Sequence, residues 1–174
     1  MEPDATREAY AGSFLRVEVE SWDGHPYDVV RHPGAAGVLP LLPGGDALLV
    51  KQTRPAIRGT LVEIPAGILD VDGEDAVTAA ARELFEETGY RHRSIEFLGA
   101  IYTSAGFSDE LVRLFVAETE PEPVGEPEDG IELLRRPFDE LVRAARAGRF
   151  RDAKTALALL LADARRQGHG APAT

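Results

Sequence analysis

The chain has 174 residues, 44% of them hydrophobic, which is enough for one sizeable core, and it has no cysteine, which excludes disulfides, a thiolate nucleophile and cysteine zinc sites. A formal net charge of −11 disfavours nonspecific nucleic-acid binding, because an acidic surface repels phosphate backbones. The N-terminus has no signal-like apolar run, and no apolar stretch reaches the roughly 18 residues of a membrane span, so we expect a cytoplasmic protein that binds neither membranes nor nucleic acids.

Alternating apolar and polar residues predict strands through the first half of the chain. The expected strands are Phe14–Trp22, Tyr27–His32, Gly37–Leu42 and Ala47–Gln52, with a hairpin turn at residues 43–46. Helical spacing of apolar residues predicts a first helix over Glu74–Glu87, ended by a left-handed cap at Gly89. Further strands are expected at Ile95–Tyr102, Glu110–Ala117 and Ile131–Arg135, followed by helices at Phe138–Ala147 and Asp152–Arg166.

This order of elements predicts an α+β sandwich. The ends, before about Tyr10 and after Gly168, are expected to be frayed. An acidic, proline-rich stretch, EPEPVGEPEDG at residues 120–130, is expected to form a loop within the domain.

The first helix concentrates negative charge. Glu83 lies three residues before Glu86 and four before Glu87, so all three carboxylates lie toward one side of the helix. This spacing costs a few tenths of a kcal/mol per pair, and Arg82 offsets only part of it. A divalent cation such as Mg²⁺ would neutralise the cluster and bridge it to substrate phosphates, whereas the alternative is a solvated acidic helix face.

The segment EIPAGILDVDGEDAVTAAARELFEETGY resembles the Nudix box, G-x5-E-x7-R-E-U-x-E-E-x-G-U, in which U is a bulky apolar residue. Gly67 opens the motif, Glu74 supplies the first glutamate, and residues 82–90 match its end. Six residues separate Gly67 from Glu74 where the pattern has five, and we place the extra residue in the loop before the helix. A calcium loop at DVDGED is the alternative, and it fails because Asp75 and Ala81 occupy its glycine and bidentate glutamate positions.

The resemblance implies a Nudix α/β/α sandwich with a mixed sheet, and Mg²⁺- or Mn²⁺-dependent hydrolysis of a nucleoside diphosphate linked to another group. It also implies that a glutamate of the acidic loop reaches the metals as general base or further ligand, the alternative being a solvated charge run. Arg82 is implied to orient a glutamate. The candidate metal ligands are Glu83, Glu86, Glu87, Glu128 and the carbonyl of Ala66, and the candidate catalytic residues are Glu86, Glu126, Glu128 and Arg82.

The segments QTRPAIRGTLVEIPAG and YTSAGFSDE, on either side of the box, resemble those of ADP-ribose pyrophosphatases. The implied substrate-binding residues are Arg54, Glu63, Gly106, Phe107 and Glu110, with Arg54 reaching a phosphate or, alternatively, being a surface charge. The subfamily's usual proline is missing, because its two candidate positions hold Thr103 and Ala105. The resemblance implies cleavage of ADP-ribose to AMP and ribose 5-phosphate. The alternatives are hydrolysis of another sugar nucleotide, such as a GDP- or UDP-sugar, and a non-catalytic nucleotide sensor.

Residues 14–32 resemble the small N-terminal sheet through which ADP-ribose pyrophosphatases form homodimers. We therefore expect N-terminal dimerisation strands in residues 1–34, the hydrolase domain in residues 35–168 and a disordered tail in residues 169–174. Exchange of this sheet would place Trp22 or Tyr27 near the partner's adenine pocket, where an aromatic ring can stack on a base. Packing in a core or an interface is the alternative for each aromatic residue.

Overall fold

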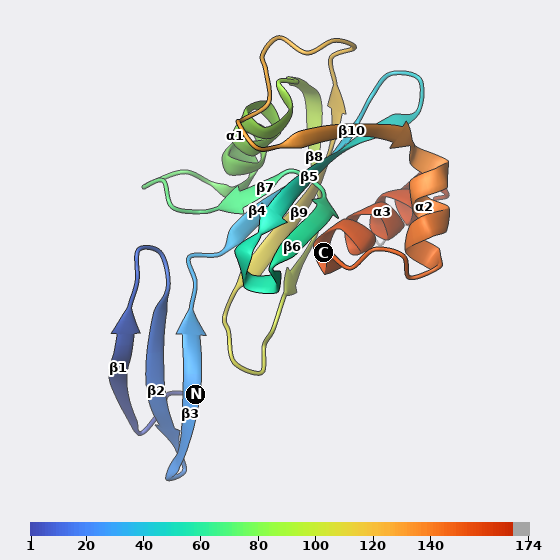
Figure 1. Cartoon of the computed structure of the whole chain (residues 1–174). Coiled ribbons are helices and arrows are strands. Elements are labelled where there is room, and N and C mark those ends of the chain that lie inside the picture. The colour runs from blue at the N-terminus through green and yellow to red at the C-terminus, as the bar shows by residue number, and fades with distance from the viewer. Residues whose placement is uncertain (169–174) are drawn as a thin grey trace.

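The computed structural model describes residues 1–168, in which a small sheet stands beside a larger one that carries three α-helices (Figure 1). The small sheet contains β1 (Ala5–Ala11), β2 (Arg16–Trp22) and β3 (His25–Arg31). The large sheet contains β4 (Ala35–Leu41), β5 (Asp46–Arg54), β6 (Gly59–Glu63), β7 (Ala66–Ile68), β8 (His92–Tyr102), β9 (Leu111–Thr119) and β10 (Glu132–Pro137). The helices are α1 (Ala76–Thr88), α2 (Phe138–Arg146) and α3 (Ala153–Arg166).

The large sheet is mixed. Its strand order is β10-β5-β4-β9-β8, with β6 beside β5 and β7 beside β4. β4 and β9 run parallel, with Ala35 opposite Val112, while the other neighbours are antiparallel. The short β7 holds Gly67, the first residue of the predicted motif, and its neighbours against β4, next to α1.

Helices cover both faces of the large sheet (Figure 1). Because successive side chains of a strand point to opposite faces, β4 sends Ala36 and Val38 toward α1 and Leu39 toward α2 and α3. Leu84 of α1 and Phe138 of α2 are almost completely buried in these two cores. The predicted α+β sandwich with a mixed sheet is therefore confirmed. Within residues 1–168 no helix is long and apolar enough to cross a membrane.

The small antiparallel sheet joins the rest of the molecule along β3. The Val30 N–H donates to Phe107 O at 2.7 Å, and the Asp109 N–H donates to Val30 O at 3.2 Å. Arg31 forms ion pairs with Asp109, Glu18 and Glu20. The sheet thereby holds the segment around Phe107, which the sequence assigns to substrate binding.

Several expectations about elements are wrong. The chain before Tyr10 is not frayed, because β1 pairs with β2 along its whole length although all its side chains are exposed. β6 and β7 were not predicted, since they are short and lie in a segment rich in Gly and Pro. Glu74 does not belong to the first helix, because Asp75 caps α1 by accepting from the Thr78 N–H at 2.9 Å. The predicted tail lies outside the described residues.

Candidate active site

Helix α1 presents its carboxylates beside the sheet because its apolar residues are fixed beneath it. Ala79, Ala80 and Leu84 are buried against β4 and β9. The helix ends at Gly89, whose φ of 73° is left-handed and whose N–H donates to Phe85 O at 2.8 Å. A side chain at Gly89 would also collide with the Gly125 carbonyl, so only glycine lets the acidic loop lie this close to the helix.

Arg82 binds three of the acidic side chains. Its Nε and Nη2 donate to the two carboxylate oxygens of Glu74, each at 3.1 Å. Its Nη1 donates to Glu83 at 2.6 Å and to Glu86 at 2.9 Å. These partners, Glu74 above all, raise the pKa of the Arg82 guanidinium. One positive charge is thus shared by three carboxylates, which leaves the cluster strongly negative.

Glu87 lies apart from this network and is only 6% exposed. It accepts hydrogen bonds from the Ala66 N–H at 3.1 Å and from Gln52 Nε2 at 3.3 Å. Burial raises the pKa of Glu87 to about 7, and Glu83 adds to the rise, whereas the two hydrogen bonds and Arg54 oppose it. Without a bound cation, this carboxylate is therefore close to half protonated at neutral pH.

The donor set fits a hard divalent cation. A Cβ at Gly67 would overlap the carboxylate of Glu83, so the motif's first glycine leaves the space that this carboxylate fills. Burial raises the pKa of Glu83, and Glu86 and Glu128 raise it further, while Arg82 opposes the shift. Carboxylate oxygens crowded in this way are the ligands that Mg²⁺ prefers. No three acidic or histidine side chains of residues 1–168 already converge at ligand distance. Arg82 draws Glu83 and Glu86 to one nitrogen, whereas the Ala66 N–H holds Glu87 apart from them.

The acidic loop lies along the end of α1. The N–H groups of Val124 and Gly125 donate to Gly89 O at 2.9 and 3.2 Å, and the Glu128 N–H donates to Glu86 O at 3.0 Å. Glu128 is exposed, yet its charge acts on Glu83. Glu126 is exposed as well. The structure therefore brings Glu128 to the acidic cluster of α1, whereas Glu126 lies on the same loop without such a contact among the described residues.

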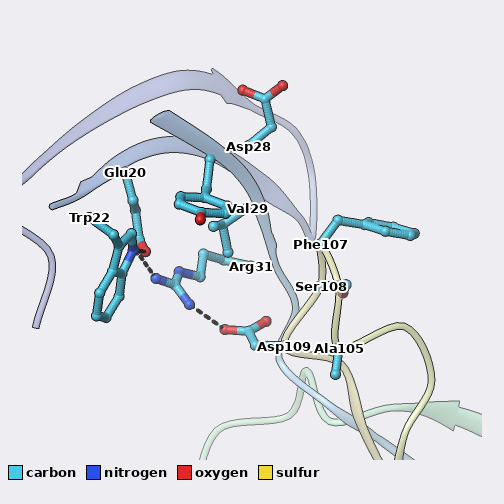
Figure 2. Close-up of a pocket in the computed structure, with 11 residues that line it drawn as sticks. Glu20, Trp22, Asp28, Val29, Arg31, Ala105, Phe107, Ser108 and Asp109 are labelled. Carbon is cyan, nitrogen blue, oxygen red and sulfur yellow. Dashed lines mark hydrogen bonds and ion pairs between the residues drawn. The ribbon is translucent and has the colours of Figure 1, made fainter. Parts of the chain in front are cut away.

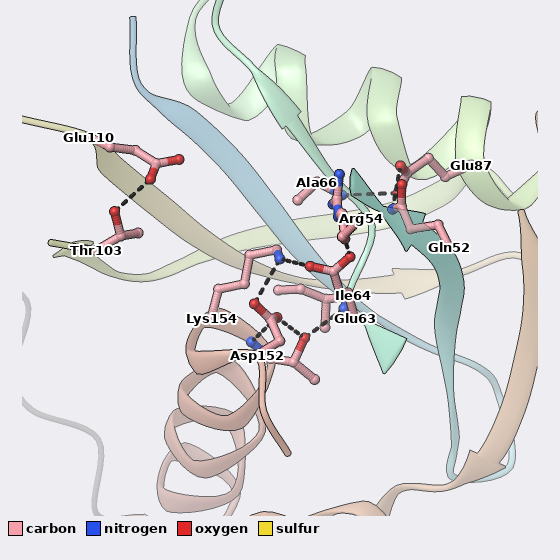
Figure 3. Close-up of polar contacts among 11 residues, drawn as sticks. Gln52, Arg54, Glu63, Ile64, Ala66, Glu87, Thr103, Glu110, Asp152 and Lys154 are labelled. Atoms are coloured by element: carbon pink, nitrogen blue, oxygen red, sulfur yellow. Dashed lines mark hydrogen bonds and ion pairs between the residues drawn. The ribbon is translucent and has the colours of Figure 1, made fainter. Parts of the chain in front are cut away.

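Arg54 and Glu63 form an ion pair along the antiparallel strands β5 and β6, in which Arg54 is opposite Gly59 and Glu63 is opposite Val50 (Figure 3). Arg54 Nε donates to Glu63 Oε2 at 2.7 Å, and Lys154 Nζ of α3 donates to Glu63 Oε1 at 2.5 Å. Glu63 is only 2% exposed, so its charge is balanced from two sides. Gln52 and Lys154 were not predicted. Gln52 lay unnoticed in QTRPA, and nothing in the local sequence connects Lys154 with a residue 91 positions earlier.

The segment of residues 103–110 forms two distinct contacts. Thr103, which occupies a candidate position for the missing proline, donates through Oγ1 to Glu110 Oε2 at 2.5 Å. The other oxygen of Glu110 lies 3.8 Å from His32 Nε2, a neighbour that the sequence did not indicate. Glu110 is thus held at the base of the loop, away from Glu87 of α1 in Figure 3.

Gly106 and Phe107 line a pocket of about 470 Å³ between this loop and the small sheet (Figure 2). Trp22 and Tyr27 line the same pocket, and Trp22 donates through its indole N–H to Glu20 at 2.8 Å. Arg31 and Asp109 also line the pocket and form an ion pair at 3.1 Å. The two aromatic residues expected to serve a partner chain therefore already face a pocket formed within one chain.

Comparison with known proteins agrees with the motif. The model of the NUDIX domain matches residues 31–159. An ADP-ribose pyrophosphatase of Bacillus subtilis is 36% identical over 147 residues, covering 82% of this chain and 79% of the relative. A methanol dehydrogenase activator of Bacillus methanolicus is 33% identical over 163 residues and 88% of each chain. A GDP-mannose pyrophosphatase of Cronobacter sakazakii is 36% identical over 151 residues, covering 76% of this chain and 78% of the relative.

Proposed function

The chain belongs to the Nudix family, and we propose that it is a Mg²⁺-dependent pyrophosphohydrolase that cleaves ADP-ribose to AMP and ribose 5-phosphate. One observation carries the proposal: a single arginine, Arg82, serves three carboxylates of the cluster, and a fourth, Glu87, is buried with a raised pKa. Such an arrangement is costly in an isolated protein and is relieved by bound cations.

The proposed metal ligands are Glu83, Glu86, Glu87 and the Ala66 carbonyl, with Glu128 as a further ligand. When bound there, Mg²⁺, or Mn²⁺ in its place, neutralises the diphosphate and lowers the pKa of a coordinated water. Arg82 orients Glu83 and Glu86 through the hydrogen bonds described above. Glu126 or Glu128 accepts the proton of the attacking water as general base, which the closeness of this loop to α1 supports.

The substrate is proposed to lie between the α1 carboxylates and the aromatic pocket. Arg54 uses Nε for Glu63, which leaves its two Nη groups for a substrate phosphate. Trp22, Tyr27 and Phe107 offer aromatic faces to a nucleobase, and Phe107 is 58% exposed. Glu110, held by Thr103, borders the same loop and is proposed to contact the substrate.

A second class of substrate, another sugar nucleotide, competes with ADP-ribose as the proposed substrate. Relatives of similar identity carry the names ADP-ribose pyrophosphatase and GDP-mannose pyrophosphatase. Thr103 and Ala105 stand where the ADP-ribose subfamily has its proline, so a GDP- or UDP-sugar is the second candidate substrate. The matching residues around Phe107 and the QTRPA segment favour ADP-ribose.

We also propose that residues 1–34 form a homodimer interface and that residues 35–168 form the hydrolase domain. Three-stranded sheets without a core of their own are marginally stable in water. Tyr10 of the small sheet and Phe14 in the turn between β1 and β2 are each at least half exposed, and large exposed apolar side chains of this kind support a surface that another chain covers.

A hydrolysis screen tests the function. The purified protein is incubated with Mg²⁺ and ADP-ribose, GDP-mannose or UDP-glucose, and products are identified by mass spectrometry. We expect the highest kcat/KM for ADP-ribose, with AMP and ribose 5-phosphate as the products. A tenfold higher kcat/KM for another sugar nucleotide would contradict the ADP-ribose assignment. Binding without turnover for every compound would instead favour the non-catalytic sensor.

A further inference from the structure

The N-terminus of α3 is hydrogen-bonded to the end of β6, beside the candidate active site (Figure 3). Asp152 caps α3 by accepting from the Thr155 N–H at 2.9 Å and from the Thr155 hydroxyl. The same hydroxyl oxygen accepts from the Ile64 N–H at 2.8 Å, a buried hydrogen bond. Lys154 joins the two parts, since its Nζ donates to Asp152 at 2.9 Å and to Glu63 at 2.5 Å.

Glu63 is a buried carboxylate with two cationic partners. Its side chain is 3% exposed, whereas that of Arg54 is 37% exposed and that of Lys154 is 14% exposed. A buried carboxylate that loses its last partner carries the full cost of its desolvation. If Arg54 were the sole partner, moving it toward a substrate phosphate would leave Glu63 unpaired. With Lys154 in place, Glu63 keeps a charged hydrogen bond when Arg54 shifts.

The charge balance leads to the same conclusion. Glu63 alone would cancel the positive charge of Arg54 and weaken its attraction for a diphosphate. Lys154 supplies a second positive charge on the opposite oxygen of Glu63, and it shares this charge with Asp152. Arg54 engages Glu63 only through Nε, and its charge also acts on Glu87 of α1. Arg54 therefore lies between the buried pair and the metal-binding carboxylates.

We propose that Lys154 is a positioning residue of the active site: by neutralising Glu63 it leaves the Arg54 guanidinium free to bind a substrate phosphate. The inference rests on the proposed function, because it takes Arg54 as the phosphate-binding residue. Lys154 itself does not touch the substrate. Lys154 acts from α3, 100 residues after Arg54 in the sequence. The motif and its neighbouring segments therefore give no indication of its role.

The Lys154→Met variant tests this role, because methionine keeps most of the side-chain volume and removes the charge. We measure kcat and KM for ADP-ribose at saturating Mg²⁺, and the affinity for α,β-methylene-ADP-ribose by calorimetry. A weakened charged hydrogen bond between Arg54 and the phosphate predicts a rise in KM and in the analogue's Kd of about tenfold to a hundredfold. The value of kcat should change much less, since the bond is made in both ground and transition states.

Two further variants separate positioning from mere support of the fold. In Lys154→Met combined with Glu63→Gln, the buried charge disappears together with its partner, so the KM should be at least about threefold lower than that of Lys154→Met alone. This double variant also keeps the test available if Lys154→Met alone folds poorly. Lys51→Met is the matched control, because Lys51 forms an exposed ion pair with Glu132 at 2.7 Å on the edge of the sheet, and its KM should be unchanged.

The outcomes distinguish this inference from the proposed function. A wild-type protein that neither binds nor cleaves ADP-ribose or another sugar nucleotide overturns both. A wild-type protein that cleaves ADP-ribose while Lys154→Met keeps its KM overturns the positioning role alone. The role is also overturned if the combined variant stays as impaired as Lys154→Met, because Lys154 then serves only to hold Asp152, the residue that caps α3.

Discussion

Substitution of Glu87 by Gln should abolish turnover and at the same time stabilise the metal-free protein. Glu87 is buried, and its pKa is raised from 4.5 to about 7. Well below pH 4.5 the Glu87 carboxyl is protonated in both the folded and the unfolded chain, so its ionisation takes nothing from the free energy of unfolding. Between the two values the folded chain holds a proton that the unfolded chain has lost, so stability falls as pH rises. Above pH 7 Glu87 is ionised in both states and the loss of stability has reached its full value. For a pKa shift of this size, that loss is roughly 3 kcal/mol in the free energy of unfolding.

The glutamine should fit the site without a new unpaired group. Its amide oxygen can accept from the Ala66 N–H, and the amide of Gln52 can turn to accept from the new NH₂ group. The stability gain relative to wild type should therefore be about 1 kcal/mol near pH 5.5 and about 3 kcal/mol near pH 8.5. Chemical denaturation in EDTA at both pH values measures it, with Glu140→Gln at an exposed position of α2 as the matched control.

Magnesium should reverse the order of the two proteins. A ligand that binds only the folded state stabilises it in proportion to the logarithm of its concentration, so Mg²⁺ should raise the Tm of wild type. Glu87→Gln has lost a ligand and should gain much less. The reasoning is refuted if the variant is no more stable than wild type at pH 8.5 without metal. Near wild-type turnover at limiting Mg²⁺ would refute the assignment of Glu87 as a ligand.

One deletion and three substitutions test the remaining assignments. Deleting residues 1–32 should give monomers or insoluble chains with weakened substrate binding, and light scattering that finds full-length monomers would contradict the dimer. Gly67→Ala should displace the Glu83 carboxylate and raise the Mg²⁺ concentration for half-maximal rate by about tenfold to a hundredfold, with Gly99→Ala in β8, where the added Cβ would contact only Leu161, as control. Glu126→Gln should lower kcat by about 10²- to 10⁴-fold at unchanged KM, whereas Glu128→Gln should raise the Mg²⁺ requirement. If both keep wild-type kcat at every Mg²⁺ concentration, the base lies elsewhere.

The parts of the fold that could be predicted are those in which local chemistry decides. The α1 helix follows from its apolar spacing and its terminal glycine, and the hairpin between β4 and β5 from its PGGD turn. The alternation of Ala36, Val38 and Leu39 between two cores follows from the strand period. In each case the signal lies within a few residues of the structure that it specifies.

The parts that escaped prediction depend on partners distant in sequence. β1 is exposed on every side chain, so no burial pattern marks it, and only backbone pairing with β2 makes it a strand. Lys154 meets Glu63 because α3 packs across the sheet next to β6. The pocket around Phe107 needs Val30 of β3 to hold the loop by backbone hydrogen bonds. None of these contacts leaves a residue preference strong enough to identify from one sequence.

The extra residue between Gly67 and Glu74 shows why the motif tolerates a change in spacing there. In the structure Glu74 precedes the Asp75 cap, so its carboxylate reaches Arg82 from a turn and not from the helix. That turn closes through a hydrogen bond from the Glu74 N–H to Val71 O, and Gly73 takes a left-handed φ of 80° in open space. An additional residue can therefore bulge outward at this turn while both ends keep their partners. Gly67 stays paired with β4 and Glu74 stays bidentate on Arg82, so both ends of the motif's loop keep their contacts.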